Sequence, residues 1–489
     1  MTHFGDGIAR FAAVQPSAPA LVTDGATFDF AWLARAVAAQ LDRFRQDGVG
    51  PGLAVALVMR DRPEHVVALF ALQRLGAAVL LIAPADPPAL RAGLVAQAGA
   101  RLALGAPEDG AGWTIPFRGF GQGGDPSAEA PPPPGLDDVC FFRRSSGTTG
   151  GVPRLTPSTH RHELAQFEIG WSVAPWGPGH RLFIIVSTSF EFGRKGMQHA
   201  LVGGGAVILP PPIASAADLA SWTRRLGATW TQMTPAHLRQ LLASDLPRPL
   251  LPGVAIITSS AALTVAERDR VMAEITPDLF MIYGTNEVGI LACARPEHLR
   301  QRPGTVGRLP SVVDAGVVDG QGRPLPADAV GEMRFRHPAY PTHYAAVEPG
   351  SPSRFADGWF YPGDLGRIDA EGFVYLRGRT DDVINVGGLK VYPADIEECL
   401  ATHPGVAEAT VIGVASSLHG TLPVAVVVLR EPTAEAVLVR HCIDRLGRAR
   451  SPVAVRVVDA LPKTPAGKID RAALVRRLRA GTEAEKRQA

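Results

Sequence analysis

Residues 145–154 read Ser145-Ser146-Gly147-Thr148-Thr149-Gly150-Gly151-Val152-Pro153-Arg154, a run of hydroxyl side chains and glycines that ends on one cation. The segment follows the apolar run 139–142, so we expect a strand to end where the glycines begin. Glycines let backbone N–H groups turn toward one point, and the hydroxyls add donors, which suits a polyphosphate. The sequence differs from the kinase-like phosphate loop, which needs Gly-Lys-Ser/Thr. An ordinary Ser/Thr/Gly surface turn is the alternative interpretation.

Length and composition indicate a globular protein with several cores. The chain has 489 residues, 46% of them hydrophobic, which predicts about two to four domains or subdomains. With 49 basic and 47 acidic residues the net charge is only +2, so neither nucleic acid nor a membrane is an expected partner. The sequence shows no signal-peptide pattern and no apolar span, and a cytoplasmic location is expected. The cysteines lack metal-binding spacing and should be buried or incidental thiols: Cys140, Cys293, Cys399 and Cys442.

Short apolar strands alternate with helical stretches along most of the chain. We expect strands at 53–59, 77–82, 181–187, 205–209, 254–258 and 279–283, and helices at 63–75 and 216–226. Continuous Val/Leu/Ile strands joined by crossover helices are typical of parallel sheets covered on both faces. The glycines and prolines of 119–135 predict a surface linker inside this large domain.

The composition of the sequence changes after Pro310. Short β segments separated by Gly, Pro and Asp indicate a small β-barrel-like subdomain. Beyond it, two strand pairs and helices at 394–401 and 434–446 indicate an independent unit. The predicted fold class is therefore α/β. A large N-terminal domain, 1–380, comprises two layered α/β subdomains plus the β-barrel-like subdomain, and a small α+β C-terminal domain, 381–489, follows.

Three further segments supply groups that ATP-dependent activation of a carboxylate needs. Residues 283–287 end an apolar strand and would bring an aromatic ring, polar donors and the carboxylate of Glu287 to a sheet edge, where that carboxylate could hold Mg²⁺. Asp364 follows a Tyr-Pro-Gly turn and suits both hydroxyls of a ribose, with Arg379 assisting. Residues 462–471 present Lys468 on a Gly/Pro-shaped loop, and a fixed cation there would offset the repulsion between carboxylate and triphosphate.

In this combination and order, the segments resemble the motifs of the ANL superfamily of adenylate-forming enzymes, which includes acyl- and aryl-CoA synthetases, carrier-protein-linked adenylation domains and firefly luciferase. The resemblance covers nearly the whole chain and rests on 145–154, 283–287, 361–364, 378–382, 387–393 and 462–471. It implies that a carboxylate and ATP give an acyl-adenylate and pyrophosphate, after which a thiol, usually of CoA, displaces AMP. The C-terminal domain would be mobile and would rotate about a hinge at Asp381.

The resemblance implies a set of phosphate-binding residues. Lys468 would bridge the carboxylate and the α-phosphate, Asn286 would face the α-phosphate in place of the family's usual Thr, and Glu287 would bind Mg²⁺. Arg154 stands where the family has Lys, in a loop one residue longer, and its planar guanidinium could shift the phosphate geometry and slow adenylation. The β- and γ-phosphates would be wrapped by the hydroxyl loop: Ser145, Ser146, Gly147, Thr148, Thr149 and Gly150.

The resemblance also implies a nucleoside site and indicates an acid pocket. Tyr283 and the adjoining Gly284 would lie against adenine, with the segment around Ala261 lining it, and Asp364 and Arg379 would hold the ribose. Residues 189–195 fall where amino-acid-activating members have Phe-Asp-x-Ser. Three candidates for the acid pocket follow: Glu191, Lys195 and Trp230. For the first two an ordinary i,i+4 ion pair is the competing interpretation, and for the tryptophan it is core packing.

The leading prediction is an AMP-forming carboxylate–CoA ligase that uses ATP, Mg²⁺ and CoA on a small-molecule carboxylic acid. One alternative is a free-standing adenylation enzyme that loads an acyl or amino acid onto a separate carrier protein. A second alternative is a catalytically impaired nucleotide-binding homologue, which Arg154 and the lengthened loop would favour. The presence of Glu287, Asp364 and Lys468 together argues for catalysis, because a sensor would not need all three.

Overall fold

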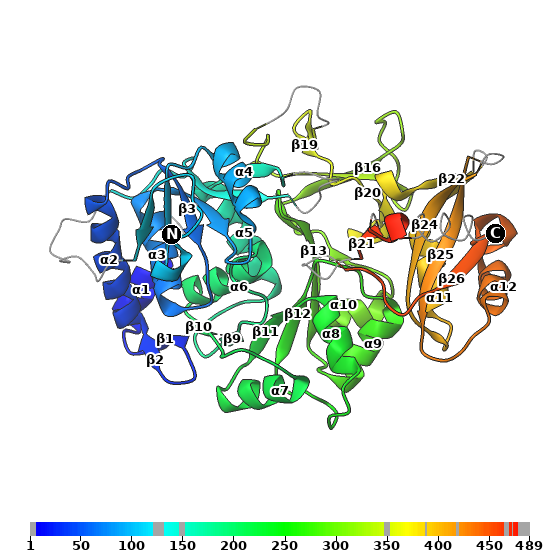
Figure 1. The fold of residues 1–489 in the computed structure, drawn as a ribbon, viewed down its shortest axis with the longest axis horizontal. Coiled ribbons are helices and arrows are strands. Elements are labelled where there is room, and N and C mark those ends of the chain that lie inside the picture. The colour runs from blue at the N-terminus through cyan, green and yellow to red at the C-terminus, as the bar shows by residue number, and fades with distance from the viewer. Residues whose placement is uncertain are drawn as a thin grey trace.

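The structure is a computed structural model that describes residues 6–120, 132–145, 152–346, 353–386, 389–416, 420–463, 469–471 and 473–477. The described strands form sheets of 15, six and five strands. In Figure 1 the two larger sheets and their helices fill the left and centre, and the smallest sheet lies at the right. The layered α/β architecture expected from the sequence is confirmed.

The six-stranded sheet has the order β6-β5-β3-β4-β7-β8. Its neighbours pair in parallel except β7 and β8, which are antiparallel. Because β7 and β8 flank the hydroxyl loop, that loop connects two neighbouring strands at the edge of the sheet. The strands are β3 (Ala54–Val58), β4 (Ala78–Ile82), β5 (Leu102–Gly105), β6 (Phe117–Gly119), β7 (Val139–Arg144) and β8 (Leu155–Thr159).

Helix α3 (Pro63–Leu75) has the bounds expected from the sequence. Proline suits the first turn because it lacks the backbone N–H, which would have no partner within the helix there. Gly76 ends the helix with a φ of 79°, a left-handed conformation that favours glycine. The helix is buried along almost its whole length and packs against α2 (Phe30–Gln46). It therefore lies inside the domain between layers, which explains why its sequence lacks a polar face.

The 15-stranded sheet follows the order β18-β19-β17-β20-β21-β15-β14-β13-β12-β11-β9-β10-β1-β2, with β16 paired to β17. Strands β1, β10, β9, β11, β12 and β13 pair in parallel, and pairing from β14 onward is antiparallel. The parallel part comprises β1 (Pro19–Val22), β9 (Arg181–Phe183), β10 (Ala206–Ile208), β11 (Trp230–Met233), β12 (Ala255–Thr258) and β13 (Leu279–Thr285), edged by β2 (Thr27–Asp29). The helices beside it include α1 (Asp6–Val14), α5 (His160–Val173), α6 (Glu191–Val202), α7 (Ala216–Arg225), α8 (Pro235–Leu242), α9 (Val265–Glu274) and α10 (Pro296–Gln301). Helix α4 (Pro88–Ala98) packs instead on β4 and β8 of the six-stranded sheet.

Strand β9 is shorter than the expected 181–187. It ends at Phe183, and the chain then bends, with the backbone N–H of Thr188 donating to Asp61 Oδ1 at 2.8 Å. The side-chain hydroxyl of Thr188 donates to the same oxygen at 2.5 Å. A tertiary contact with a residue far away in the sequence thus competes with strand extension, and it delivers the chain to the start of α6.

The segments expected to form a β-barrel-like subdomain are hydrogen-bonded to the large sheet. Strand β21 pairs with β15, and β15 pairs with β14, so the ladder continues without a break from the parallel strands. Its strands are β14 (Gly289–Ala294), β15 (Gly307–Arg308), β16 (Asp314–Val318), β17 (Gly331–Arg336), β18 (Phe355–Ala356), β19 (Trp359–Phe360), β20 (Asp364–Ile368) and β21 (Phe373–Arg379).

The smallest sheet belongs to the C-terminal part. The chain leaves β21 through the 3₁₀ turn Thr380–Asp382 and enters β22, which pairs only within the smaller sheet among the described residues. The division at 380/381 stays a prediction. The elements are β22 (Ile384–Val386), β23 (Leu389–Val391), α11 (Pro393–Ala401), β24 (Val406–Ser416), β25 (Gly420–Leu429), α12 (Glu435–Leu446) and β26 (Ala454–Val457).

All four cysteines are free and buried, as expected. Burial raises the pKa of each thiol, to about 12 for Cys293 and Cys442. Within the described ranges no helix is both long enough and apolar enough to cross a bilayer.

Candidate functional site

The base of the hydroxyl loop is closed by hydrogen bonds between its two ends. The backbone N–H of Ser145 donates to Arg154 O at 2.8 Å, and the backbone N–H of Arg154 donates to Ser145 Oγ at 3.0 Å. Just before the loop, Arg144 Nη2 donates to Asp86 Oδ2 at 2.6 Å and fixes the end of β7. Residues 146–151 lie outside the described residues, so the phosphate contacts of Ser146, Gly147, Thr148, Thr149 and Gly150 stay predictions.

Arg154 points its guanidinium over an aromatic ring. Its Cζ lies 4.1 Å from the ring centroid of Tyr344, a cation–π arrangement. Burial, followed by the charge of Glu287, raises the pKa of the Tyr344 phenol to about 12, and the charge of Arg154 opposes the rise. Tyr344 therefore contacts the loop cation and feels the charge of the expected metal-binding carboxylate.

Glu287 stands on the turn between β13 and β14. Thr285 pairs with Gly289 across this hairpin, so Asn286, Glu287 and Val288 form its tip. The Glu287 side chain is buried, and desolvation raises the pKa of its carboxyl above the usual value, although a hydrogen bond from Thr285 and the charge of Arg154 oppose the rise. A buried carboxylate that lacks a full counter-charge is a suitable site for a cation.

No three His, Cys, Asp or Glu side chains gather into a metal site in the part of the chain that the structure describes. Mg²⁺ commonly binds through one or two carboxylates together with water and substrate phosphates. Glu287 alone therefore fits a magnesium ion that arrives with a nucleotide, and it does not fit a cage of protein ligands.

Asp364 is held by two side chains from different strands. The Tyr283 hydroxyl donates to Asp364 Oδ2 at 2.6 Å, and Arg379 Nη1 donates to Asp364 Oδ1 at 2.9 Å. Asp364 on β20 lies opposite Arg379 on β21 in the ladder. Burial and the neighbouring carboxylate raise the pKa of the Tyr283 phenol well above its usual value, so it remains a donor at neutral pH. The contact of Tyr283 with adenine stays a prediction.

The segment around Ala261 lies next to this group. Strands β12 and β13 are parallel neighbours, so their carboxyl ends reach the same edge of the sheet. Ser259 Oγ donates to Ile282 O at 2.9 Å, and Ser260 has a φ of 82°, a left-handed conformation that costs a non-glycine residue energy. Ala261 is half-buried and Gly284 is exposed, so both residues border solvent at this edge of the sheet.

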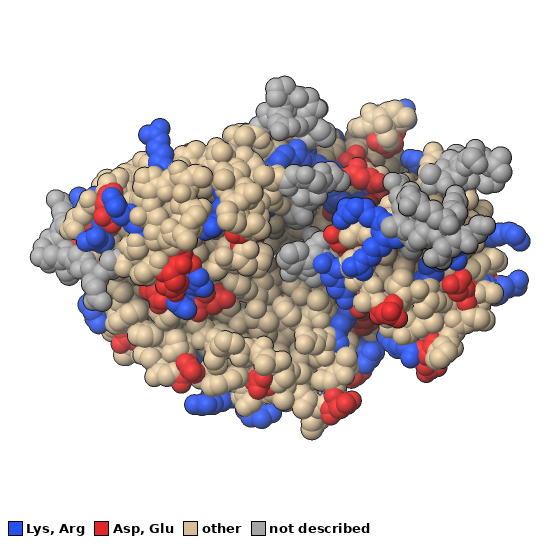
Figure 2. All heavy atoms as spheres, viewed as in Figure 1, with Lys and Arg blue, Asp and Glu red and all other residues tan. Residues whose placement is uncertain are grey.

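The C-terminal candidates are only partly described. Lys468 and residues 387–388 lie outside the described residues. The ends of the lysine loop are joined, because Lys463 pairs with Ile469 in an isolated β-bridge. Asp381 is exposed, and it forms an ion pair with Arg354 at 3.2 Å. Figure 2 shows Lys and Arg side chains gathered along the junction between the large part and the C-terminal part.

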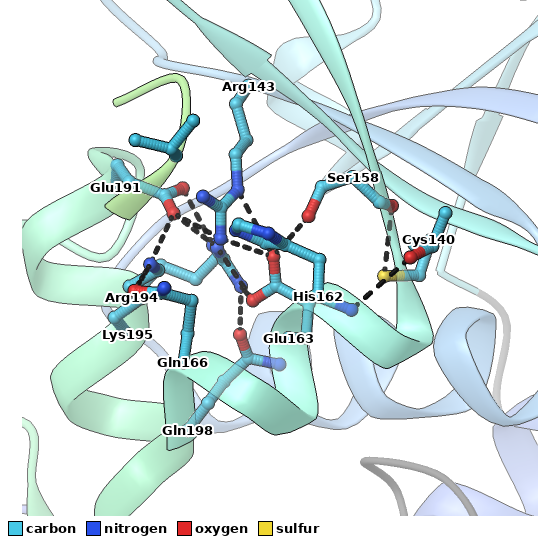
Figure 3. Close-up of polar contacts among 12 residues, drawn as sticks. Cys140, Arg143, Ser158, His162, Glu163, Gln166, Glu191, Arg194, Lys195 and Gln198 are labelled. Carbon is cyan, nitrogen blue, oxygen red and sulfur yellow. Dashed lines mark hydrogen bonds and ion pairs between the residues drawn. The ribbon is translucent and has the colours of Figure 1, made fainter. Parts of the chain in front are cut away.

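The acid-pocket candidates Glu191 and Lys195 belong to a buried charge cluster, which we define as Arg143, Glu163, Glu191, Arg194 and Lys195 (Figure 3). Glu163 accepts from Arg143 Nη2 at 2.5 Å, from Arg194 Nη1 at 3.2 Å and from Ser158 Oγ at 2.7 Å. These cations hold the pKa of Glu163 well below its usual value despite burial. The i,i+4 pair between Glu191 and Lys195 is present at 3.6 Å.

Trp230 packs in the core. Its ring centroid lies 5.0 Å from that of Trp176 and 5.0 Å from that of Phe280, and the side chain is buried. These contacts account for its position without a ligand.

Sequence reasoning missed Arg143, Glu163 and Tyr344. Arg143 lies in an apolar strand, and no local pattern marks a cation whose partner is 20 residues away. The Tyr283–Asp364 hydrogen bond joins residues 81 positions apart, so only the fold reveals it.

Comparison with known proteins identifies the family. The model of the AMP-binding enzyme family matches residues 8–344, and that of the AMP-binding enzyme C-terminal domain matches residues 395–468. Sulfoacetate–CoA ligase of Cupriavidus necator is 32% identical over 70% of this chain and 68% of its own. Feruloyl-CoA synthase of Amycolatopsis sp. is 30% identical over 94% and 96%. The crystal structure of ATP-bound MatB from Rhodopseudomonas palustris superposes with a TM-score of 0.86 at 24% identity, covering 96% of this chain and 98% of that one. The chain belongs to the AMP-binding enzymes, the ANL superfamily of adenylate-forming enzymes.

Proposed function

We propose that the protein is an ATP-dependent carboxylate–CoA ligase. The observation that carries this proposal is the meeting of two groups at one end of β13. Asp364, bonded to Tyr283 and Arg379, lies on one side, and the buried Glu287 lies on the other, beside the closed base of the hydroxyl loop. A ribose needs an acceptor such as Asp364, and a polyphosphate with its metal needs groups such as Glu287 and the hydroxyl loop.

The large part binds and orients the nucleotide. Asp364, positioned by Tyr283 and Arg379, accepts from the two ribose hydroxyls. The hydroxyl loop and Arg154 surround the β- and γ-phosphates, while Asn286 donates to the α-phosphate. Donors that are positioned before the reaction would reduce the reorganisation needed as charge moves toward pyrophosphate.

Glu287 would hold Mg²⁺ at the tip of the β13–β14 turn. The ion would supply positive charge to the departing pyrophosphate. Burial of Glu287 keeps water away from its carboxylate and strengthens its attraction for a cation.

In the first step a carboxylate oxygen attacks the α-phosphorus, and the bond to pyrophosphate breaks. The ammonium group of Lys468 offsets the electrostatic repulsion between the two anions as they approach. In the second step the sulfur of CoA attacks the carbonyl carbon of the adenylate, and AMP leaves. Rotation about Asp381 would withdraw Lys468 between the steps, and the exposed Asp381–Arg354 pair would have to break or move with it.

The names of the relatives support CoA as the acceptor. Relatives that act on acids as different as sulfoacetate and ferulate form CoA thioesters. Since those acids share little beyond a carboxylate, the acid used here has to be found by screening. A phosphopantetheinylated carrier protein is the second candidate acceptor, because it presents the same thiol arm.

A screen of pyrophosphate release over short, medium, aromatic and amino acids tests the proposal, with thioester formation measured for CoA and for a loaded carrier protein. We expect Lys468→Ala to abolish adenylate formation yet largely spare thioester formation from a supplied acyl-adenylate. The control is Arg440→Ala, which removes an exposed cation of the same domain that pairs with Asp444. Equal loss in both half-reactions would refute the role of Lys468. If no acid causes AMP release, the result would support the alternative that the protein is a catalytically impaired nucleotide-binding homologue.

A further inference from the structure

The buried charge cluster holds more positive than negative charge. Its cations come from β7 and α6, and its two carboxylates come from α5 and α6. With Lys195 protonated, one positive charge remains without a counter-charge. An uncompensated charge in a buried site is costly, and proteins usually pair such groups or use them to bind an ion.

Lys195 is the least satisfied member of the cluster. Both oxygens of Glu191 are engaged by Arg194, at 2.7 Å and 3.2 Å, so Lys195 approaches this carboxylate only to 3.6 Å. Lys195 also donates a long hydrogen bond, 3.3 Å, to Gln166 Oε1. Burial and the charge of Arg143 lower the pKa of the Lys195 ammonium to about 7, which agrees with a cation that lacks a strong partner.

Hydrogen-bond donors are in excess at the same place. Gln166 Oε1 accepts from the Ile290 backbone N–H at 2.7 Å and from Lys195, while its buried Nε2 finds no acceptor among the described residues. Arg143 Nη1 is likewise buried without an acceptor there. A group that brings acceptor oxygens and negative charge would satisfy what the cluster lacks.

Glu191 and Lys195 are the more exposed members of the cluster, and Lys195 lies against the start of β14, beside the hairpin that carries Glu287. The side chains of Arg143, Glu163 and Arg194 are at most 1% exposed, whereas Glu191 is 17% and Lys195 10% exposed. A Cβ placed on Gly289 would lie 2.6 Å from Lys195 Nζ. Gly289 pairs with Thr285 across the hairpin that carries Asn286 and Glu287.

We propose that Lys195 binds a second anionic group of the acid substrate, so that the protein prefers short acids carrying a carboxylate, sulfonate or phosphonate besides the reacting carboxylate. Gly289 and Thr285 are about 5 Å apart as paired strand residues, so an anion at Lys195 sits roughly one strand spacing from the turn expected to face the α-phosphate. Only a short spacer between the two anionic groups fits this distance. The inference rests on the proposed function, because it assigns the acid of that reaction.

Acids of equal chain length that differ in the second anionic group test this preference. Succinate and 3-sulfopropanoate are each compared with butanoate, and pyrophosphate release is measured. We expect kcat/KM to be at least about tenfold higher for the dianionic acids, the size of a good hydrogen bond to a charged group. Lys195→Met should remove about 10- to 100-fold of kcat/KM for the dianionic acids and leave butanoate unchanged or improved. Lys195→Arg should retain the preference, and Arg270→Met, which deletes an exposed cation paired with Glu274, should change nothing.

The pH dependence gives a second readout that a purely structural lysine would not produce. KM for succinate should rise as pH increases above about 7, because the free ammonium loses its proton there and the affinity for a second anion falls. KM for butanoate should not rise over the same pH range, and Lys195→Arg should abolish the rise for succinate. The charged and titratable groups that face Lys195 are Arg143 on β7, His162 and Glu163 on α5, and Glu191, Arg194 and His199 on α6.

Calorimetric binding of succinate and butanoate without ATP separates this inference from the proposed function. Tighter binding of succinate that Lys195→Met removes supports the inference even if no acid releases pyrophosphate. A preference for butanoate, or an equal loss for both acids in Lys195→Met, overturns the inference and leaves the ligase proposal standing.

Discussion

Removal of a single oxygen atom tests the proposed ribose site. The Tyr283 hydroxyl donates at 2.6 Å to Asp364, a neutral donor to a charged acceptor, and such bonds contribute about 1.5–3 kcal/mol. The Asp364 side chain is 13% exposed, so water recovers part of this in Tyr283→Phe. A net loss of about 1–2 kcal/mol corresponds to a rise of about 5- to 30-fold in KM for ATP. Butanoate and CoA constants should stay within about twofold.

The assay is pyrophosphate release with ATP varied at saturating acid, and Tyr340→Phe is the matched control. Tyr340 is also buried, but its hydroxyl donates at 3.2 Å to the backbone carbonyl of Ile290 and not to a carboxylate. Its loss should cost about 1 kcal/mol of stability and leave KM for ATP unchanged. An unchanged KM for ATP in folded Tyr283→Phe, or an equal rise in both variants, would refute the placing of the ribose at Asp364.

Two further predictions concern buried carboxylates. Glu163→Gln should lower the free energy of unfolding by about 3–5 kcal/mol, seen as a lower urea midpoint, because two buried arginines lose a shared partner. Because folding lowers the pKa of Glu163, the stability that its ionised carboxylate contributes is fully present above the unfolded pKa near 4.5 and is lost as pH falls through the lower folded pKa. A urea midpoint of Glu163→Gln that matches wild type at pH 7 would contradict the role of the cluster. The pKa of Glu287 is raised by burial, so protons should compete with Mg²⁺ and weaken its apparent affinity as pH falls through that value. Titration of activity with Mg²⁺ at several pH values should show this in wild type and not in Glu287→Gln, and an identical pH dependence in the variant would contradict a metal-binding role.

Local sequence signals predicted the elements that are fixed by local chemistry. Helix α3 begins at a proline and ends at a glycine, and both bounds were predictable because these residues act through their own backbone conformations. Strand β9 was predicted too long because its end is decided by Asp61, more than a hundred residues earlier in the chain. A pattern of apolar residues carries no information about such a competitor.

The site likewise has features that local sequence predicts and features that it does not. Motifs placed Glu287 at the end of an apolar strand and Asp364 after a turn, because each follows a segment with a distinct composition. The partners that define their chemistry are remote in the sequence: Tyr283 holds Asp364, and the ring of Tyr344 lies under the guanidinium of Arg154. Side-chain pairs of this kind depend on how the sheets and helices pack, which one sequence does not encode locally.

The four enclosed thiols make the chain ready for site-specific labelling. Alkylating reagents attack an accessible thiolate, and here each native thiol is shielded and holds its proton. A cysteine introduced at exposed Val312 in the large part and another at Val437 in the C-terminal part would therefore accept maleimide dyes without removal of any native residue. Energy transfer between the two dyes would then report domain rotation in real time as ATP, acid and CoA are added in turn.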